Sequence, residues 1–209
     1  MLFLFVTFVC NKFGPILDYI VDIDINLFLF LNGINSSFWD SFFYVVTGRV
    51  FWIPFLLGLL FLAYLRVGWK VVYVLLFMGV AMGLADVISV KLFKEVFERL
   101  RPCHNPIITD LVHTVNGHCG GQFGFVSSHA TNSFSLAVFA GLLFKRKFRF
   151  VMPVMLFWAV LVSYSRIYVG VHFPLDVFCG GMLGVIIAYL VYQLFLFSNQ
   201  KFNLKLEEL

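Results

Sequence analysis

Three short segments of the chain hold residue types that act together in phosphoryl transfer. They read Lys94-x6-Arg101-Pro102, Val126-Ser127-Ser128-His129 and Ser165-Arg166-x5-His172-x3-Asp176. Phosphoryl transfer requires fixed cations for the negative charge, a nucleophile with an orienting partner, and an acid for the leaving group. Lysine, arginine, histidine and aspartate in these three segments supply each of those parts.

The composition places these segments in a membrane protein. Hydrophobic residues make up 61% of the 209 residues and charged residues only 12%, whereas about 25% charged residues is usual for a soluble domain. The apolar residues come in long uncharged runs, and a run of about 20 of them can cross the hydrocarbon core as a helix. A chain of this length has room for about five or six spans and for no separate soluble catalytic domain. The chemistry must therefore take place in loops or at helix ends.

The gaps between charged residues predict five spans. Their ranges are 50–65, 71–90, 130–145, 150–165 and 177–198. Pro153 and Pro174 fall just inside the start of a span, where a missing backbone N–H costs nothing. Gly180 and Gly184 form a G-x-x-x-G pattern, which lets a neighbouring helix approach closely. The predicted fold is all-α, a multispanning membrane helix bundle of five or six transmembrane helices with its catalytic motifs at the outer ends.

Basic residues in two connections set the expected orientation, because loops rich in lysine and arginine stay in the cytoplasm. They are Arg66, Lys70, Lys145, Arg146, Lys147 and Arg149. The loop 91–128 and the connection 165–173 then face outward together, so we expect an inner-membrane protein with its site facing the periplasm or the outside. The basic residues are divided among loops rather than gathered in one solvated patch, and we expect no nucleic-acid partner.

The N-terminal residues form a separate segment in this interpretation. The first ten are apolar but too few to span a membrane. Three aspartates further along argue against deep burial: Asp18, Asp22 and Asp24. Interfacial helices are therefore favoured over one extra tilted span. We divide the chain into this N-terminal segment (1–48), a membrane catalytic domain (49–199) and a cytoplasmic tail (200–209).

The three segments resemble the signature motifs of the type 2 phosphatidic acid phosphatase superfamily, which also includes soluble bacterial acid phosphatases and vanadium haloperoxidases. The resemblance covers residues from about 90 to 180. The second motif departs from the usual Pro-Ser-Gly-His, because Val126 stands for the proline and Ser128 for the glycine. A positive φ at that glycine would strain Ser128, whereas a serine with ordinary φ can still present its N–H to phosphate.

The resemblance implies a role for each histidine. His172 is the expected nucleophile that forms a phosphohistidine, and His129 the general acid that later activates water. Pro174 as first helical residue places Asp176 in the first turn, where its carboxylate can face His172 and fix its tautomer.

The remaining motif residues are expected to bind the phosphate oxygens. They are Lys94, Arg101, Ser127, Ser128 and Arg166. N–H groups at the start of the span after His129 add to this site, since a helix N-terminus favours an anion. No metal or other cofactor is expected, because three cations do the electrostatic work.

Two cysteines bracket the outer loop between the first two motifs. In an oxidising compartment Cys103 and Cys119 are expected to form a disulfide that clamps this loop over the site. A zinc site built from them with His104, His113 and His118 is an alternative, but its spacing matches no standard ligand pattern. Reduced cysteines without a role are the third interpretation.

A site at the level of the outer headgroups suits a lipid phosphate or diphosphate whose tail stays in the bilayer. We favour undecaprenyl diphosphate, since a small protein without a soluble headgroup-binding domain suits a compact phosphate head. The alternatives are a lipid A, phosphatidylglycerophosphate or phosphatidate phosphatase, and a lipid phosphotransferase. A small anion transporter is the non-enzymatic alternative. It would need polar residues across the membrane, and the last three spans have few below their outer ends.

Overall fold

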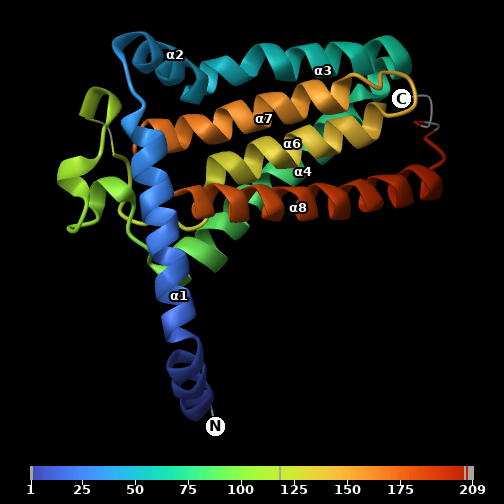
Figure 1. The fold of residues 1–209 in the computed structure, drawn as a ribbon. Coiled ribbons are helices and arrows are strands. Elements are labelled where there is room, and N and C mark those ends of the chain that lie inside the picture. The colour runs from blue at the N-terminus through green and yellow to red at the C-terminus, as the bar shows by residue number, and fades with distance from the viewer. Residues whose placement is uncertain (1, 118, 205, 207–209) are drawn as a thin grey trace.

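The computed structural model describes residues 2–117, 119–204 and 206, and helices dominate it. Five helices run side by side in an elongated bundle (Figure 1): α3 (Trp52–Val67), α4 (Val71–Ile88), α6 (Ser128–Phe144), α7 (Val151–Tyr168) and α8 (Pro174–Lys201). Each corresponds to one predicted span, with ends that differ by a few residues. The all-α prediction is confirmed for the described part of the chain.

Three helical stretches of the described chain are long and apolar enough to cross a membrane. They are Trp52–Phe97, Val151–Tyr168 and Pro174–Lys201. The first contains both α3 and α4, which are joined by the helical turn Gly68–Lys70. The chain bends in this turn, where Gly68 has a φ of +56°. The number of crossing helices stays a prediction.

Helix α6 lies at the centre and packs against α4, α7 and α8. The packing of α8 on α6 depends on the predicted small residues, because a Cβ at Gly180 would lie 2.7 Å from the Ser127 carbonyl oxygen. Large buried side chains such as Trp158 and Phe139 fill the space between the other helices. Close helix packing therefore fixes how the N-terminus of α6 meets the N-terminus of α8.

The two ends of the bundle differ in content. The α3–α4 and α6–α7 connections and the C-terminal residues lie at one end, and the loops 98–127 and 169–173 lie at the other (Figure 1). Lys70 Nζ donates to the Leu204 carbonyl oxygen at 2.8 Å and so ties the C-terminal residues to the first connection. The basic connections are thus at one end and the three motifs at the opposite end.

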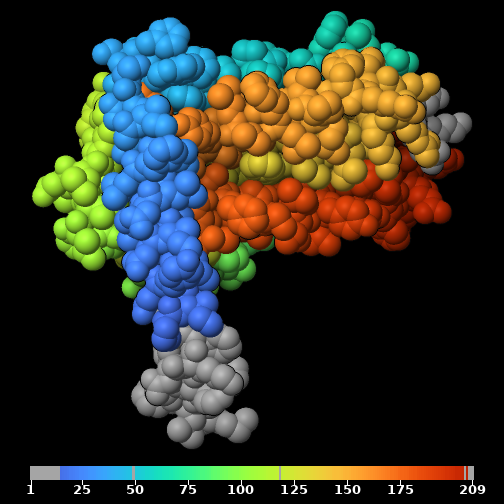
Figure 2. Space-filling model, viewed as in Figure 1, coloured from blue at the N-terminus to red at the C-terminus, as the bar shows by residue number. Residues whose placement is uncertain are grey.

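The N-terminal segment forms two helices. α1 (Leu2–Gly33) lies across the motif-bearing end of the bundle, and α2 (Ser37–Thr47) follows it (Figures 1 and 2). Ser36 is the N-cap of α2. The aspartates in α1 differ in environment. Asp18 and Asp22 are exposed as expected, but Asp24 is 5% exposed because it pairs with Arg99.

Candidate active site

The first motif reaches the site through a π-helical turn. α4 continues into this turn, Ser89–Lys94, and then into the short helix α5 (Glu95–Phe97). A π turn holds an extra residue, which rotates the residues after it about the helix axis, and such turns are frequent at functional sites. Lys94 Nζ donates to Ser128 Oγ at 2.8 Å, and the same hydroxyl lies 2.7 Å from Ser89 Oγ. The lysine of the first motif is thus fixed against a serine of the second.

A short antiparallel pairing orients the arginines that follow. The Gly124 N–H donates to the Arg99 carbonyl oxygen at 2.8 Å. Residues two apart in an extended segment share a face, so Arg99 and Arg101 are directed to the same side. Arg101 is 9% exposed, and its Nε and Nη1 donate to the carbonyl oxygens of Phe123 at 3.2 Å and Cys119 at 3.3 Å. Backbone acceptors therefore hold its guanidinium in place.

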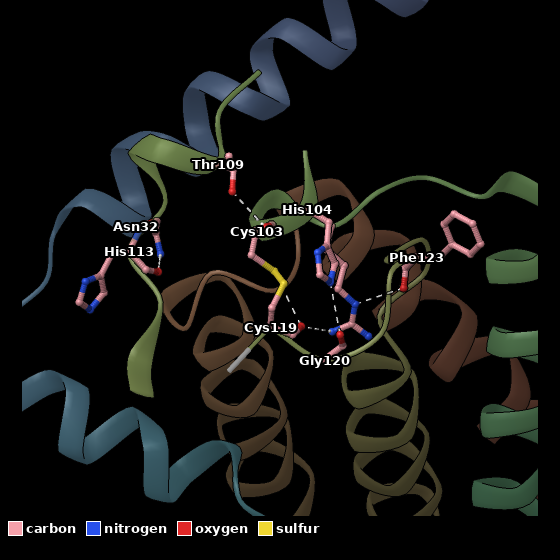
Figure 3. Close-up of a disulfide and its surroundings, with 9 residues drawn as sticks. Asn32, Cys103, His104, Thr109, His113, Cys119, Gly120 and Phe123 are labelled. Atoms are coloured by element: carbon pink, nitrogen blue, oxygen red, sulfur yellow. Dashed lines mark hydrogen bonds between the residues drawn. A yellow bond between two sulfur atoms is a disulfide. The ribbon is translucent and has the colours of Figure 1, made fainter. Parts of the chain in front are cut away.

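A disulfide closes the loop that supplies one of these acceptors. Cys103 and Cys119 are bonded to each other, as Figure 3 shows. Their Cα atoms are 6.0 Å apart. Thr109 Oγ1 donates to the Cys103 carbonyl oxygen at 3.1 Å. The disulfide joins residues 16 apart in sequence and fixes the Cys119 carbonyl beside Arg101.

The cysteine sulfurs are bonded to each other in the structure, so they are not thiolates that could bind zinc. His104 lies beside the two cysteines, with its ligand nitrogen within 4.8 Å of both sulfurs. His113 is held elsewhere: its Nε2 lies 2.8 Å from Asp40 Oδ1. The His113 backbone N–H donates to Asn32 Oδ1 at 2.8 Å (Figure 3). His104 Nε2 lies 3.3 Å from the Gly120 carbonyl oxygen. His118 lies outside the described residues.

The two serines of the second motif have different places. Ser127 is the N-cap of α6: its Oγ accepts from the Ala130 N–H at 3.5 Å, and its own N–H donates to the Asp176 carbonyl oxygen at 3.0 Å. Ser128 is the first residue of α6 and is not among the described residues with positive φ. Serine in place of the family's glycine therefore brings no backbone strain there, and its hydroxyl joins Lys94.

The third motif spans the end of α7 and the start of α8. Arg166 lies in the last turn of α7, where Nη1 donates to Thr47 Oγ1 and Nε has no hydrogen-bond partner among the described residues. The chain then turns at Gly170, with a φ of +79°, and α8 begins at Pro174 as the sequence predicts. This turn brings His172 back to Arg166, whose carbonyl oxygen accepts from the His172 N–H at 3.2 Å.

His172 and Asp176 face each other at the start of α8. The distance from His172 Nδ1 to Asp176 Oδ2 is 3.5 Å, and Oδ2 also accepts from the Phe173 N–H at 3.0 Å. Gly124 packs against both, since a Cβ there would lie 3.0 Å from Asp176 Oδ2 and 3.5 Å from His172 Nδ1. Burial, reinforced by three nearby cations, holds the pKa of His172 well below its ordinary value. The ring is therefore neutral at neutral pH and keeps a free lone pair.

One cavity of about 540 Å³ connects the three motifs. Six of the predicted site residues line it: Lys94, Arg101, Ser128, His129, Arg166 and His172. Asp176 lies behind His172 and is buried, and Ser127 lies behind the start of α6 as its cap. The cavity thus combines two histidines with three cations, the set that phosphoryl transfer requires.

The family profile of the PAP2 superfamily matches residues 70–200, which contain all three motifs. This chain belongs to the PAP2 superfamily. The family that the motifs predict is therefore confirmed, and this PAP2 protein is a membrane lipid phosphatase, a hydrolase of lipid phosphate esters.

Two curated bacterial proteins align with most of this PAP2 phosphatase. It is 36% identical over 188 residues to the lipid A 4'-phosphatase of Porphyromonas gingivalis, covering 88% of this chain and 78% of that protein. It is 39% identical over 180 residues to the lipid A 4'-phosphatase of Bacteroides thetaiotaomicron, covering 84% and 78%. The crystal structure of a PAP2-type phosphatidylglycerolphosphate phosphatase from Bacillus subtilis shares the fold, with a TM-score of 0.66, 24% identity and coverage of 92% and 93%.

Sequence reasoning missed two residues that support this PAP2 site from behind Asp176, namely Arg99 and Asp24. Arg99 Nη1 lies 2.7 Å from Asp176 Oδ1, and Nη2 lies 2.6 Å from Asp24 Oδ2. The guanidinium also lies over the Phe173 ring, 4.3 Å from its centroid. Arg99 follows Glu98, which predicts an ordinary surface pair; its place two residues before Arg101 in an extended segment was the one available signal.

Proposed function

We propose that this PAP2 phosphatase hydrolyses a phosphate monoester on a lipid A-type glycolipid, at the outer face of the inner membrane, through a phosphohistidine on His172. The observation that carries the proposal is the single cavity in which two histidines and three cations meet. Two lipid A 4'-phosphatases that align with most of the chain support the substrate class.

In the first step, His172 Nε2 attacks the phosphorus, a P–N bond forms, and the P–O bond to the lipid breaks. Asp176 supports this attack because its carboxylate faces Nδ1, which favours the tautomer with the proton on Nδ1. His129, which lines the same cavity, donates a proton to the departing lipid oxygen. A general acid in this position contributes about 10²- to 10⁴-fold to the rate.

In the second step, water attacks the phosphohistidine. His129 is now the base that takes the proton from this water, the P–N bond breaks, and inorganic phosphate leaves. Lys94, Arg101 and Arg166 line the cavity and stabilise the negative charge of the phosphoryl oxygens in both transition states, because fixed donors need no reorganisation. We propose no metal or other cofactor for either step.

We further propose that the five bundle helices cross the membrane and that α1 lies along its outer interface. The basic connections at the opposite end support this orientation, since such loops stay in the cytoplasm. The division into an interfacial segment (1–48), a catalytic membrane domain (49–199) and a cytoplasmic tail (200–209) follows from it. The site then meets lipid phosphates at headgroup depth.

Phosphate release by the detergent-purified protein tests the proposal. The substrates are lipid A, undecaprenyl diphosphate, phosphatidylglycerophosphate and phosphatidate, each with EDTA present. His172→Ala should abolish release, and His104→Ala, which changes an exposed loop histidine, is the matched control. Lipid A should be hydrolysed fastest.

Each other result changes a specific part of the proposal. Fastest hydrolysis of undecaprenyl diphosphate would make this lipid the substrate, as the small size of the protein favours. Transfer of phosphate to a second lipid would make the protein a phosphotransferase. Release by folded His172→Ala at the wild-type rate would contradict the mechanism.

A further inference from the structure

Two polar residues of the active-site cavity have no part in the proposed mechanism. Asp86 of α4 and Asn132 of α6 both line the cavity, in addition to the groups assigned to phosphate. Asp86 is exposed although it lies within the apolar stretch Trp52–Phe97. An ionisable side chain in such a stretch is costly and indicates a functional site.

The charge of Asp86 opposes phosphate binding. A carboxylate in a cavity built for an anion repels that anion, so its presence needs another explanation. The ion pairs among the described side chains use other carboxylates, and none of the described basic groups lies within 4.0 Å of Asp86. An ionised carboxylate accepts hydrogen bonds and cannot donate them. Asp86 therefore suits a ligand part that carries hydrogen-bond donors.

Asn132 offers a second acceptor on the leaving-group side. It lies three residues after His129 on α6, so the two side chains are neighbours on one helix face. Its Oδ1 atom is buried and has no hydrogen-bond partner among the described residues. Buried polar atoms are nearly always paired, which points to a partner supplied by the ligand. Because His129 protonates the departing oxygen in the proposed mechanism, Asn132 lies near the alcohol that departs.

We propose that Asp86 and Asn132 form a leaving-group subsite that accepts hydrogen bonds from hydroxyl or amide N–H groups of the lipid headgroup. This inference rests on the proposed function and narrows its substrate class. The preferred substrates are phosphate monoesters of an alcohol that carries further donors, such as a sugar or a free glycerol hydroxyl. A prenyl chain or a fully acylated glycerol has no such donor.

The subsite discriminates between substrates because an unsuitable headgroup leaves the acceptor oxygens of Asp86 and Asn132 without hydrogen-bond partners. A site built to hydrogen-bond a substrate O–H or N–H disfavours the analogue that lacks it, since acceptors covered by that analogue lose water without gaining a partner. Asp86 and Asn132 should thus favour donor-bearing headgroups without touching the phosphorus.

The test compares phosphatidylglycerophosphate, whose glycerol keeps a free hydroxyl, with phosphatidate, whose glycerol is fully acylated. The measured quantity is kcat/KM for phosphatidylglycerophosphate divided by kcat/KM for phosphatidate. Asp86→Leu should lower this ratio by about 10- to 100-fold, the loss expected for a hydrogen bond to a charged group. Asp86→Asn and Asn132→Leu should lower it by a smaller factor. Asp110→Asn, which changes an exposed aspartate of the outer loop, should leave the ratio at the wild-type value.

Folding is followed by gel filtration and thermal unfolding, and the two milder variants decide the matter if Asp86→Leu does not fold. An unchanged ratio in the folded variants would overturn the subsite, even if kcat/KM fell by the same factor on both substrates. The proposed function is tested separately by wild-type hydrolysis of lipid A. Lipid A hydrolysis with an unchanged ratio refutes the subsite alone. A lowered ratio without lipid A hydrolysis refutes the glycolipid substrate alone.

Discussion

Arg99 Nη1 lies 2.7 Å from Asp176 Oδ1, so the carboxylate that faces His172 is held from its other side by a guanidinium. The same guanidinium lies 2.6 Å from Asp24 Oδ2 of α1, and Asp24 Oδ1 accepts from the Leu175 N–H at 2.8 Å. One arginine thus joins the N-terminal helix to the start of α8. The orientation of the His172–Asp176 pair depends on this contact in the proposed mechanism.

Arg99→Met should lower kcat by about 10- to 100-fold and change KM little. This is the typical cost of removing a residue that orients a functional side chain by hydrogen bonding to it, as measured for metal ligands. The physical reason is that Asp176 loses a partner while it stays buried. Arg99→Lys should restore part of kcat, and Arg146→Met on the basic connection serves as the control. Steady-state kinetics on one substrate measures this. A raised KM with wild-type kcat would show that Arg99 does not act through Asp176.

Replacing Arg101 by methionine should shift the pH dependence of kcat/KM. Burial and the nearby cations hold the pKa of His172 low, because a positive charge disfavours the protonated ring. Removing one cation raises that pKa, and since only the neutral ring attacks, the acid limb moves to higher pH. The maximum should also fall by about 10²- to 10³-fold, as for the loss of a transition-state donor.

Lys147→Met is the matched control for this shift, since it removes a cation from the far end of the bundle. Comparing variant and wild type on the same substrate cancels the titration of the substrate itself. An acid limb that stays in place in Arg101→Met would mean that a different group sets it.

The disulfide should contribute to both stability and substrate binding. Cys103→Ser with Cys119→Ser opens a loop closed over 16 residues, which predicts a loss of about 3 kcal/mol in the free energy of unfolding. KM should rise, because the Cys119 carbonyl then no longer holds Arg101 as firmly. Cys179→Ser is the control. Thermal unfolding with and without reductant measures the effect, and a reductant-insensitive wild type would contradict it.

Gly124→Ala should reduce kcat by about tenfold or more while the protein still folds, since small misplacements of catalytic groups cost up to about 10² in rate. An added Cβ would lie 3.0 Å from Asp176 Oδ2 and must displace the pair that includes His172. Gly121→Ala is a matched control, because a Cβ there meets no atom within 4 Å. Equal kinetics for the two variants would rule out the tight contact.

The sequence allowed much of this fold to be predicted, because the apolar runs between charges are long and Pro174 fixes the start of α8. The motif residues could be assigned to one end of the bundle because the basic connections mark the other end. His172, His129 and the three cations then meet in one cavity.

Other features depend on contacts that no local pattern encodes. Arg99 and Asp24 are 75 residues apart, and nothing in either neighbourhood indicates the other. Ser127 looks like a phosphate ligand by position, but its N–H is taken by the Asp176 carbonyl. Asp86 lies in an otherwise apolar helix, and only the packing of α4 around the cavity shows that its side chain lines the site.

Trapping the intermediate tests the central claim most directly. Lipid A labelled with radioactive phosphate at the 4' position is mixed with purified protein, the reaction is quenched within milliseconds in alkali, and peptides are mapped by mass spectrometry. We predict an alkali-stable, acid-labile phosphate on His172 that is absent from His172→Ala. Rapid turnover with no label on the protein, or with label on another residue, would contradict the account.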